Sequence, residues 1–293
     1  MCTLIAVHRR VPGRPLVVAA NRDEYLDRPA EGPAIRETRV GRVLAPLDRR
    51  AGGTWLGLNE HGVFAALTNL RADAPDPQRR SRGEVVLDAL GAASASEAAR
   101  RLGELETEAY NPFNLFVADD RSAHVIVYRE RAATQRLAAG VHVIGNVEAT
   151  GPGNPKVKRI RDEVEEALSA ELVGSAGRDD DEGLLDRLAT VCRHHGSPGS
   201  ETQKTRDRQD ASNEDRHLEN REPLGDTCVH IEGTYGTRSS LLLELGAGFS
   251  GGRLLHADGP PCRTAYEDVS SLLIELGRRP AVDTAESLMR TAS

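Results

Sequence analysis

Residues 16–24 read LVVAANRDE, an aliphatic run followed directly by four polar residues. The aliphatic part is typical of a β-strand, and a proline- and glycine-containing loop, VPGRP at 11–15, joins it to an earlier aliphatic run, CTLIAV at 2–7. This pattern predicts a hairpin in which the two strands pair. The pairing would place the tetrad Asn21–Glu24 near Cys2. The tetrad itself is then either a solvated turn at the strand end or a site.

Cys2 follows the initiator methionine directly. A small residue at this position usually allows the methionine to be removed, after which Cys2 would carry an α-amine and a thiol on the same residue. This pair is a nucleophile with its own general base, since the two groups have ordinary pKa values of about 8 and about 8.5. Arg22 would stabilise the thiolate and Asp23 would orient the amine. The alternative is an accidental small residue at a frayed chain start.

Other polar strings are predicted at the ends of strands, where α/β and α+β proteins often place their chemistry. The string GGTWLG at 52–57 carries the chain's only tryptophan and is either part of a site or a tight turn with a core aromatic residue. Asn69 follows a predicted strand, and its amide is either an oxyanion donor or a strand cap. Asn146 ends another strand, and Arg238 lies in YGTRSS at 235–240.

The rest of the chain predicts strands in two blocks, with helices between them. Capping-box spacing at Ser81 and Ser94 predicts two helix starts, and a helix with one apolar face is expected after Pro155. The first seventy residues lack helical periodicity. Such an order favours layered α+β packing. The expected strands cover 40–44, 54–58, 63–67, 114–118, 124–128, 141–145, 227–231 and 239–245, and further helices cover about 182–193 and 266–276.

Composition limits the function classes. The chain has 293 residues, 39% of them hydrophobic, and a net charge of −7, which disfavours a general nucleic-acid role. No apolar stretch approaches the ~18 residues of a membrane span, and no secretory signal is recognised, so a cytoplasmic location is expected. The chain is predicted to be one domain over 1–293, with a mobile polar insertion at 196–226.

The four cysteines have neither zinc-site nor redox CxxC spacing. Cys192 with His194 and His195 resembles part of a metal cluster, but a fourth ligand is missing. No metal and no cofactor is therefore assigned from the sequence.

Taken in order, the strings MC, NRDE, GGTWLG, TN, SRG, YNPFNL, GN and YGTRSS resemble the NRDE family, also called the transport-and-Golgi-organisation family. The resemblance covers most of residues 2–245. The family is similar to the N-terminal-nucleophile (Ntn) hydrolases, which implies an α+β fold built as a four-layer αββα sandwich. Choloylglycine hydrolases and penicillin V acylases, its mechanistic relatives, use an N-terminal cysteine to cleave non-peptide amide bonds.

The resemblance also implies roles for individual residues. Cys2 matches the nucleophile, Asp23 the aspartate that holds the α-amine, and Asn69 the oxyanion donor. Asn146 matches a second site asparagine. Two arginines are less direct matches: Arg22 lies in the corresponding string with a different local order, and Arg238 is preferred to Arg159 as the late arginine.

These roles predict a hydrolase that acts on a non-peptide amide C–N bond of a small molecule. The alternative is a non-catalytic protein that binds and carries haem or a lipid in an Ntn-like pocket. The expected partner is thus a small-molecule substrate or an apolar ligand. The sequence does not indicate the substrate or the oligomeric state.

Overall fold

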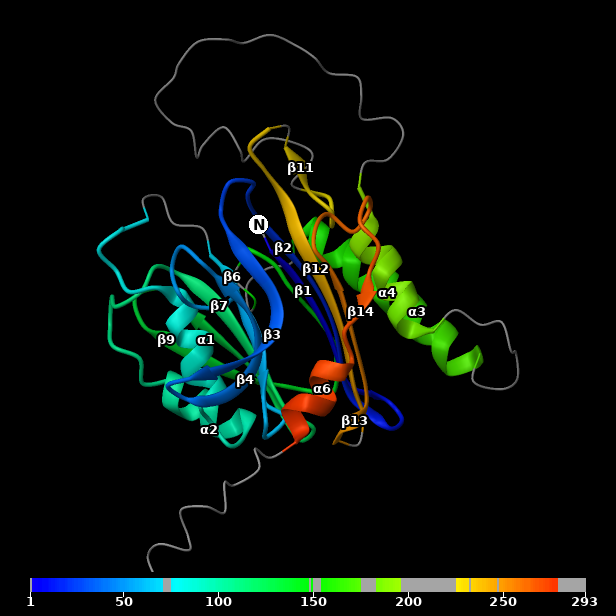
Figure 1. The fold of residues 1–293 in the computed structure, drawn as a ribbon, viewed down its shortest axis with the longest axis horizontal. Coiled ribbons are helices and arrows are strands. Elements are labelled where there is room, and N and C mark those ends of the chain that lie inside the picture. The colour runs from blue at the N-terminus through cyan, green and yellow to red at the C-terminus, as the bar shows by residue number, and fades with distance from the viewer. Residues whose placement is uncertain are drawn as a thin grey trace, which may run out of the picture.

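The computed structural model describes residues 2–70, 75–147, 149, 154–174, 183–195, 225–231, 233–246 and 248–278. Its strands form two seven-stranded sheets whose neighbours are antiparallel throughout. The two sheets stack face to face, and a helix pair lies on the outer side of each (Figure 1). This is the four-layer αββα arrangement expected above, and it confirms the predicted α+β fold class.

The first sheet has the order β10-β1-β2-β12-β13-β14, with β11 paired to β12. Helices α3 (Pro155–Gly174) and α4 (Leu184–Arg193) cover its outer face through an apolar core that includes Ile160, Val164 and Leu168. The strands are β1 (Thr3–Val11), β2 (Arg14–Tyr25), β10 (Gly140–Ile144), β11 (His230–Ile231), β12 (Tyr235–Gly246), β13 (Gly248–Ala257) and β14 (Glu267–Asp268).

The second sheet runs in chain order from β3 to β9 and carries α1 (Arg82–Leu90) and α2 (Ala95–Leu102) on its outer face. Both predicted helix starts are confirmed, because Ser81 Oγ accepts from Gly83 N at 3.3 Å and Ser94 Oγ accepts from Glu97 N at 3.2 Å. The strands are β3 (Ala30–Thr38), β4 (Gly41–Asp48), β5 (Leu56–Asn59), β6 (Phe64–Asn69), β7 (Phe113–Ala118), β8 (Ala123–Tyr128) and β9 (Ala132–Leu137).

A third apolar core fills the space between the sheets, to which β1 contributes Leu4 and Ala6 while Ile5 and Val7 face the helices. This alternation follows from the two-residue period of a strand that is covered on both faces. Helix α6 (Ser271–Gly277) packs on β13 and contacts β3 and β4 of the other sheet, so it closes one end of the sandwich (Figure 1).

One boundary expectation is wrong in a way that matters for the site. The tetrad Asn21–Glu24 does not follow β2 but lies inside it, because β12 pairs with β2 as far as Tyr25. Asn21, Arg22 and Asp23 are consequently buried. The polar segment expected at 196–226 falls outside the described residues, apart from Gly225 and Asp226. Among the described helices, none combines the length and apolar character needed to cross a membrane.

Candidate active site

Cys2 directly precedes β1 and sits at the end of the first sheet where β2 and β10 flank it. Thr3 pairs with Asn21 of β2, and Leu4 pairs with Ile144 of β10. The half-buried Cys2 Sγ lies 3.8 Å from the main-chain oxygen of Asp23. Burial raises the pKa of the Cys2 thiol above its ordinary value, and the nearby charge of Arg22 acts in the opposite direction. The predicted proximity of Cys2 and the tetrad is therefore present in the structure.

Asp23 is held from both its side chain and its main chain by β12. Thr237 Oγ1 donates to Asp23 Oδ1 at 2.6 Å, and the Tyr235 hydroxyl donates to the Asp23 main-chain oxygen at 2.9 Å. Burial raises the pKa of the Asp23 carboxyl, while the charge of Lys156 and the Thr237 hydrogen bond oppose that shift. The carboxyl group is thus fixed in position beside the chain start.

Arg22 stacks on the tryptophan of the GGTWLG string. Its guanidinium carbon lies 4.3 Å from the centre of the Trp55 ring, and its side chain is only 5% exposed. Glu24 is 4.0 Å away, and the Arg22 guanidinium donates no hydrogen bond to any side chain or main-chain oxygen of the described residues. Burial lowers the pKa of Arg22, though its ordinary value is so high that the group stays charged. A charged, stacked group with unused donors is suited to bind an anion or a polarised carbonyl.

Two further cations approach Cys2, and sequence reasoning missed both. Lys156 is half-buried at the start of α3; burial lowers its pKa, and the negative charges of Asp23 and Cys2 raise it. Burial also lowers the pKa of Arg82, and Cys2 is again among the groups that raise it. Lys156 is one of only three lysines in an arginine-rich chain, which was an available signal, and Arg82 lies in the SRG string.

The predicted asparagines Asn69 and Asn146 meet at the junction of the two sheets. Asn146 Nδ2 donates to the main-chain oxygen of Asn69 at 2.6 Å, whereas the Asn69 side chain is exposed. Asn146 Oδ1 is buried and has no hydrogen-bond partner among the described residues. Continuing the β1–β10 register two residues beyond Leu4 and Ile144 brings Cys2 level with Asn146.

Arg238 occupies a β-bulge in β12 opposite the tetrad. Thr237 pairs with Asp23 and Ser239 with Arg22, which leaves Arg238 as the extra residue between them. Its Nε is buried without a hydrogen-bond partner among the described residues. A bulge re-aims the side chain of the inserted residue and is common next to active sites.

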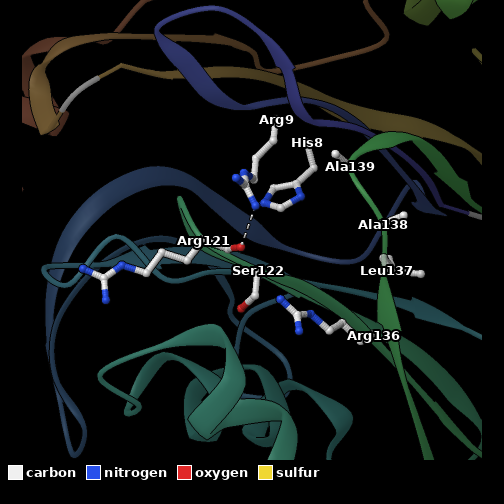
Figure 2. A pocket seen from close by; sticks show the side chains of 8 residues that line it. All are labelled: His8, Arg9, Arg121, Ser122, Arg136, Leu137, Ala138 and Ala139. Atoms are coloured by element: carbon white, nitrogen blue, oxygen red, sulfur yellow. Dashed lines mark hydrogen bonds between the residues drawn. The ribbon is translucent and has the colours of Figure 1, made fainter.

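A cavity of about 290 Å³ lies elsewhere, at the other end of β1. Figure 2 shows its lining of His8 and Arg9 from β1 opposite Arg121, Ser122 and Arg136, with Arg9 Nη1 donating to the Arg121 main-chain oxygen at 3.3 Å. His8 is six steps along an extended strand from Cys2, a distance of about 20 Å. This basic cavity is therefore not part of the site around Cys2.

The comparisons with known proteins agree with this architecture. The family model described as Transport and Golgi organisation 2 matches residues 1–246. The bovine Transport and Golgi organization protein 2 homolog is 31% identical over 183 residues, which are 56% of this chain and 66% of that protein. The human homolog is 38% identical over 107 residues, which are 36% of this chain and 38% of that protein. The matched region thus spans less than two thirds of each relative's length.

Solved structures share the fold at low sequence identity. Penicillin V acylase from Agrobacterium tumefaciens superposes with a TM-score of 0.50 at 11% identity, covering 93% of this chain and 88% of that chain. The C2A mutant of conjugated bile acid hydrolase from Clostridium perfringens gives 0.50 at 11% identity, covering 96% of this chain and 95% of that one. At this identity the likeness shows a common fold.

Proposed function

This chain belongs to the Transport and Golgi organisation 2 family, predicted above as the NRDE family, and from that premise we propose that it is an N-terminal-cysteine hydrolase. The proposed substrate is a small molecule with a non-peptide amide C–N bond. The observation that carries the proposal is the position of the Cys2 thiol, 3.8 Å from the main-chain oxygen of a buried aspartate that β12 holds in place.

The first step in this mechanism activates the thiol. After removal of Met1, the α-amine of Cys2 takes the thiol proton, either directly or through a water molecule. Asp23 orients the resulting ammonium, and Arg22, fixed on Trp55, lowers the energy of the thiolate. Burial raises the pKa of the Cys2 thiol, and the positive charge of Arg22 acts against that shift and so favours the thiolate.

In the second step the thiolate attacks the amide carbonyl carbon. We assign the side-chain amides of Asn69 and Asn146, together with Arg238, to the developing oxyanion and the bound substrate. In comparable sites one oxyanion donor contributes about 3–4 kcal/mol. The C–N bond breaks, the amine leaves with the proton held by the α-amine, and a thioester remains on Cys2. Water then cleaves the thioester to release the acid and the free thiol.

The names of the structural neighbours support this class of chemistry. One is a penicillin V acylase and another is a conjugated bile acid hydrolase. Because both are only 11% identical to this chain, they support the reaction type through the shared fold and do not indicate this chain's substrate.

The test is a screen of N-acyl amides with the purified protein, followed by mass spectrometry of the intact chain. We expect loss of Met1, turnover of at least one amide, and an acyl adduct on Cys2. Cys2→Ala should abolish both turnover and adduct while the urea denaturation midpoint stays close to that of the native chain. A chain with an uncleaved N-terminal extension is the matched control, since it keeps the thiol and lacks the free amine on Cys2.

Two results would contradict the proposal. Retention of Met1 in the native host would remove the general base. Haemin or lipid binding that shifts an absorbance or fluorescence spectrum, with no amide turnover and no effect of Cys2→Ala, would instead favour the alternative of ligand carriage.

A further inference from the structure

Four metal-ligating side chains converge at a place that no recognised sequence motif marks. His230 begins β11 and Cys228 lies two residues before it, Cys262 lies between β13 and β14, and His195 follows α4. Cys228 Sγ is 3.6 Å from Cys262 Sγ and 3.5 Å from His230 Nε2, and His230 Nε2 is 3.1 Å from Cys262 Sγ. Ligating atoms of His195, His230 and Cys262 all lie within 4.8 Å of one another.

We propose that His195, Cys228, His230 and Cys262 form a structural zinc site. All four are ligands that tetrahedral zinc prefers, and two cysteines with two histidines make a complete set. Zn–S bonds of about 2.3 Å and Zn–N bonds of about 2.0–2.1 Å give tetrahedral edges of about 3.8 Å between sulfurs and about 3.5 Å between sulfur and nitrogen. The three donors Cys228, His230 and Cys262 match one face of that tetrahedron to within about 0.4 Å.

Main-chain and side-chain contacts outside the cluster hold these segments together before any metal binds. Cys228 N donates to the main-chain oxygen of His194 at 2.9 Å, which fixes Cys228 beside the end of α4. Arg193 Nε donates to the main-chain oxygen of Pro261 at 3.3 Å, which fixes the turn that carries Cys262. Three of the four donors, Cys228, His230 and Cys262, are thus preorganised, which lowers the cost of closing around an ion, and the exposed His195 would move toward Cys228 to complete the set.

The ligand set differs from the one that the sequence suggested. Cys192, expected beside His194 and His195, is buried next to Ser240 and Tyr266 instead, and His194 Nδ1 lies 3.9 Å from Glu163 Oε1. His195 alone of that group joins the cluster, where its ring meets that of His230 edge to face at 5.2 Å.

A metal here would fasten three chain segments that are distant in sequence. His195 and Cys228 are 33 positions apart, and Cys228 and Cys262 are 34 apart. Closing long connections is where a metal stabilises a fold most, and binding would release the protons of both thiols to solvent. The proposed zinc site lies beside the residue that holds Asp23. Val229, next to Cys228 in the chain, donates from its main-chain N to Thr237 Oγ1 at 2.8 Å, and the same hydroxyl donates to Asp23 Oδ1.

The test measures metal binding on the full chain purified under reducing conditions. We expect one zinc per chain by elemental analysis, and cobalt substitution should give tetrahedral visible bands with a sulfur-to-cobalt charge-transfer band. Cys228→Ser and Cys262→Ser should lose the charge-transfer intensity, and His195→Gln should change the visible bands. His194→Gln is the matched control and should leave the spectrum unchanged, since its side chain lies outside the cluster.

Thiol alkylation of the native chain gives a second readout that does not depend on variants folding. Zinc should protect Cys228 and Cys262 from iodoacetamide but not Cys2, and a chelator should remove the protection. The proposal is overturned if reduced protein takes up no cobalt with a charge-transfer band, if both cysteine variants keep that band, or if peptide mapping finds a Cys228–Cys262 disulfide in place of a metal.

Discussion

At the scale of single residues, Asp23 has two opposed effects. Its carboxyl is buried, and burial is the largest cause of its raised pKa, so the fold disfavours the ionised form. The proposed mechanism requires that same ionised form to hold the α-amine of Cys2. Asp23 should therefore contribute to activity while it lowers the stability of the fold at neutral pH.

Asp23→Asn separates these two effects. We expect turnover to fall about 100-fold or more, because the variant no longer positions the α-amine of Cys2, and positioned proton-transfer groups contribute about 10²–10⁴-fold. An unfolded aspartate ionises near pH 3.9, and because the native pKa of Asp23 is raised, increasing pH favours the unfolded chain from about that value until the native carboxyl ionises as well. The stability of the native chain relative to Asp23→Asn should thus decline as pH rises from about 4, as measured by urea denaturation at several pH values.

Asp120→Asn is the control, because the Asp120 side chain is 69% exposed and 3.8 Å from Arg121 on the surface. Its stability difference from the native chain should stay small at every pH. If Asp23→Asn instead lost stability relative to the native chain with rising pH, ionised Asp23 would be stabilising and the assignment would be wrong.

Cys2, Arg22 and Asp23 could be predicted from the sequence as neighbours, because the hairpin that pairs their strands and the residue types themselves are local features of the sequence. Lys156 and Arg82 were missed, since their approach to Cys2 depends on how α3 and α1 dock on the two sheets. No spacing rule carries that information. Their proximity is a product of tertiary packing.

At the scale of elements, two glycines determine how closely the GGTWLG loop approaches helix α1. A Cβ added at Gly53 would lie 2.9 Å from both the Cα and the carbonyl carbon of Gly83. These neighbours are main-chain atoms that cannot rotate away. The SRG and GGTWLG strings therefore contact each other, and the Trp55 ring of the second string lies against the Arg22 guanidinium.

Gly53→Ala should separate the loop from the helix. We expect a loss of about 1–3 kcal/mol in the free energy of unfolding, the usual cost of overpacking, measured by urea denaturation. Gly251→Ala is matched to it, because a Cβ there would meet nothing within 4 Å. Equal losses in the two variants would mean that the close approach is not what requires glycine at position 53.

Strand positions were largely predictable from aliphatic runs, and strand ends were not. The runs predicted β1, β4, β6, β7, β8 and β10 because each buries a stretch of apolar residues. Strands β3 and β9 were missed because they lie at the two edges of the second sheet, where their partly exposed residues show no apolar run. Strand β13 was missed as well, since it opens with GFSGG, and the helix expected at 266–276 begins only at Ser271, after the short strand β14. β2 extends through polar residues only because β12 supplies a partner.

At the scale of the whole molecule, the candidate site draws residues from both sheets, so it requires the two sheets to keep a fixed position relative to each other. Asp23 and Arg238 lie in strands of the first sheet and Cys2 directly precedes β1, whereas Asn69 ends β6 of the second sheet and Trp55 directly precedes β5. Asn114 of β7 links the sheets: its Nδ2 donates to the main-chain oxygens of Gly145 at 3.2 Å and Val147 at 2.8 Å, and its Oδ1 accepts from Ala149 N at 3.2 Å.

Removal of this link should destabilise the sandwich and disturb the site together. Asn114 is fully buried, so Asn114→Ala breaks four hydrogen bonds, including one of 3.3 Å to Thr68 Oγ1, and removes the partner of Val147 O and Ala149 N. We expect a loss of roughly 2–4 kcal/mol in the free energy of unfolding, since each such group costs about 1–3 kcal/mol when unpaired. Turnover should also fall under conditions where the variant is folded, because Asn146 follows directly after Gly145.

Asn111 of the same YNPFNL string provides the comparison. It exchanges hydrogen bonds with the main chain of Asp76 at the surface, 2.8 Å and 2.9 Å long, and touches neither sheet junction nor site through them. Asn111→Ala should therefore cost less than about 1 kcal/mol and leave turnover intact. If both variants lost turnover equally, or if Asn114→Ala lost stability while its turnover stayed native, the relative position of the two sheets would not control the site. The proposed role of Asn146 at the oxyanion would then need a different support.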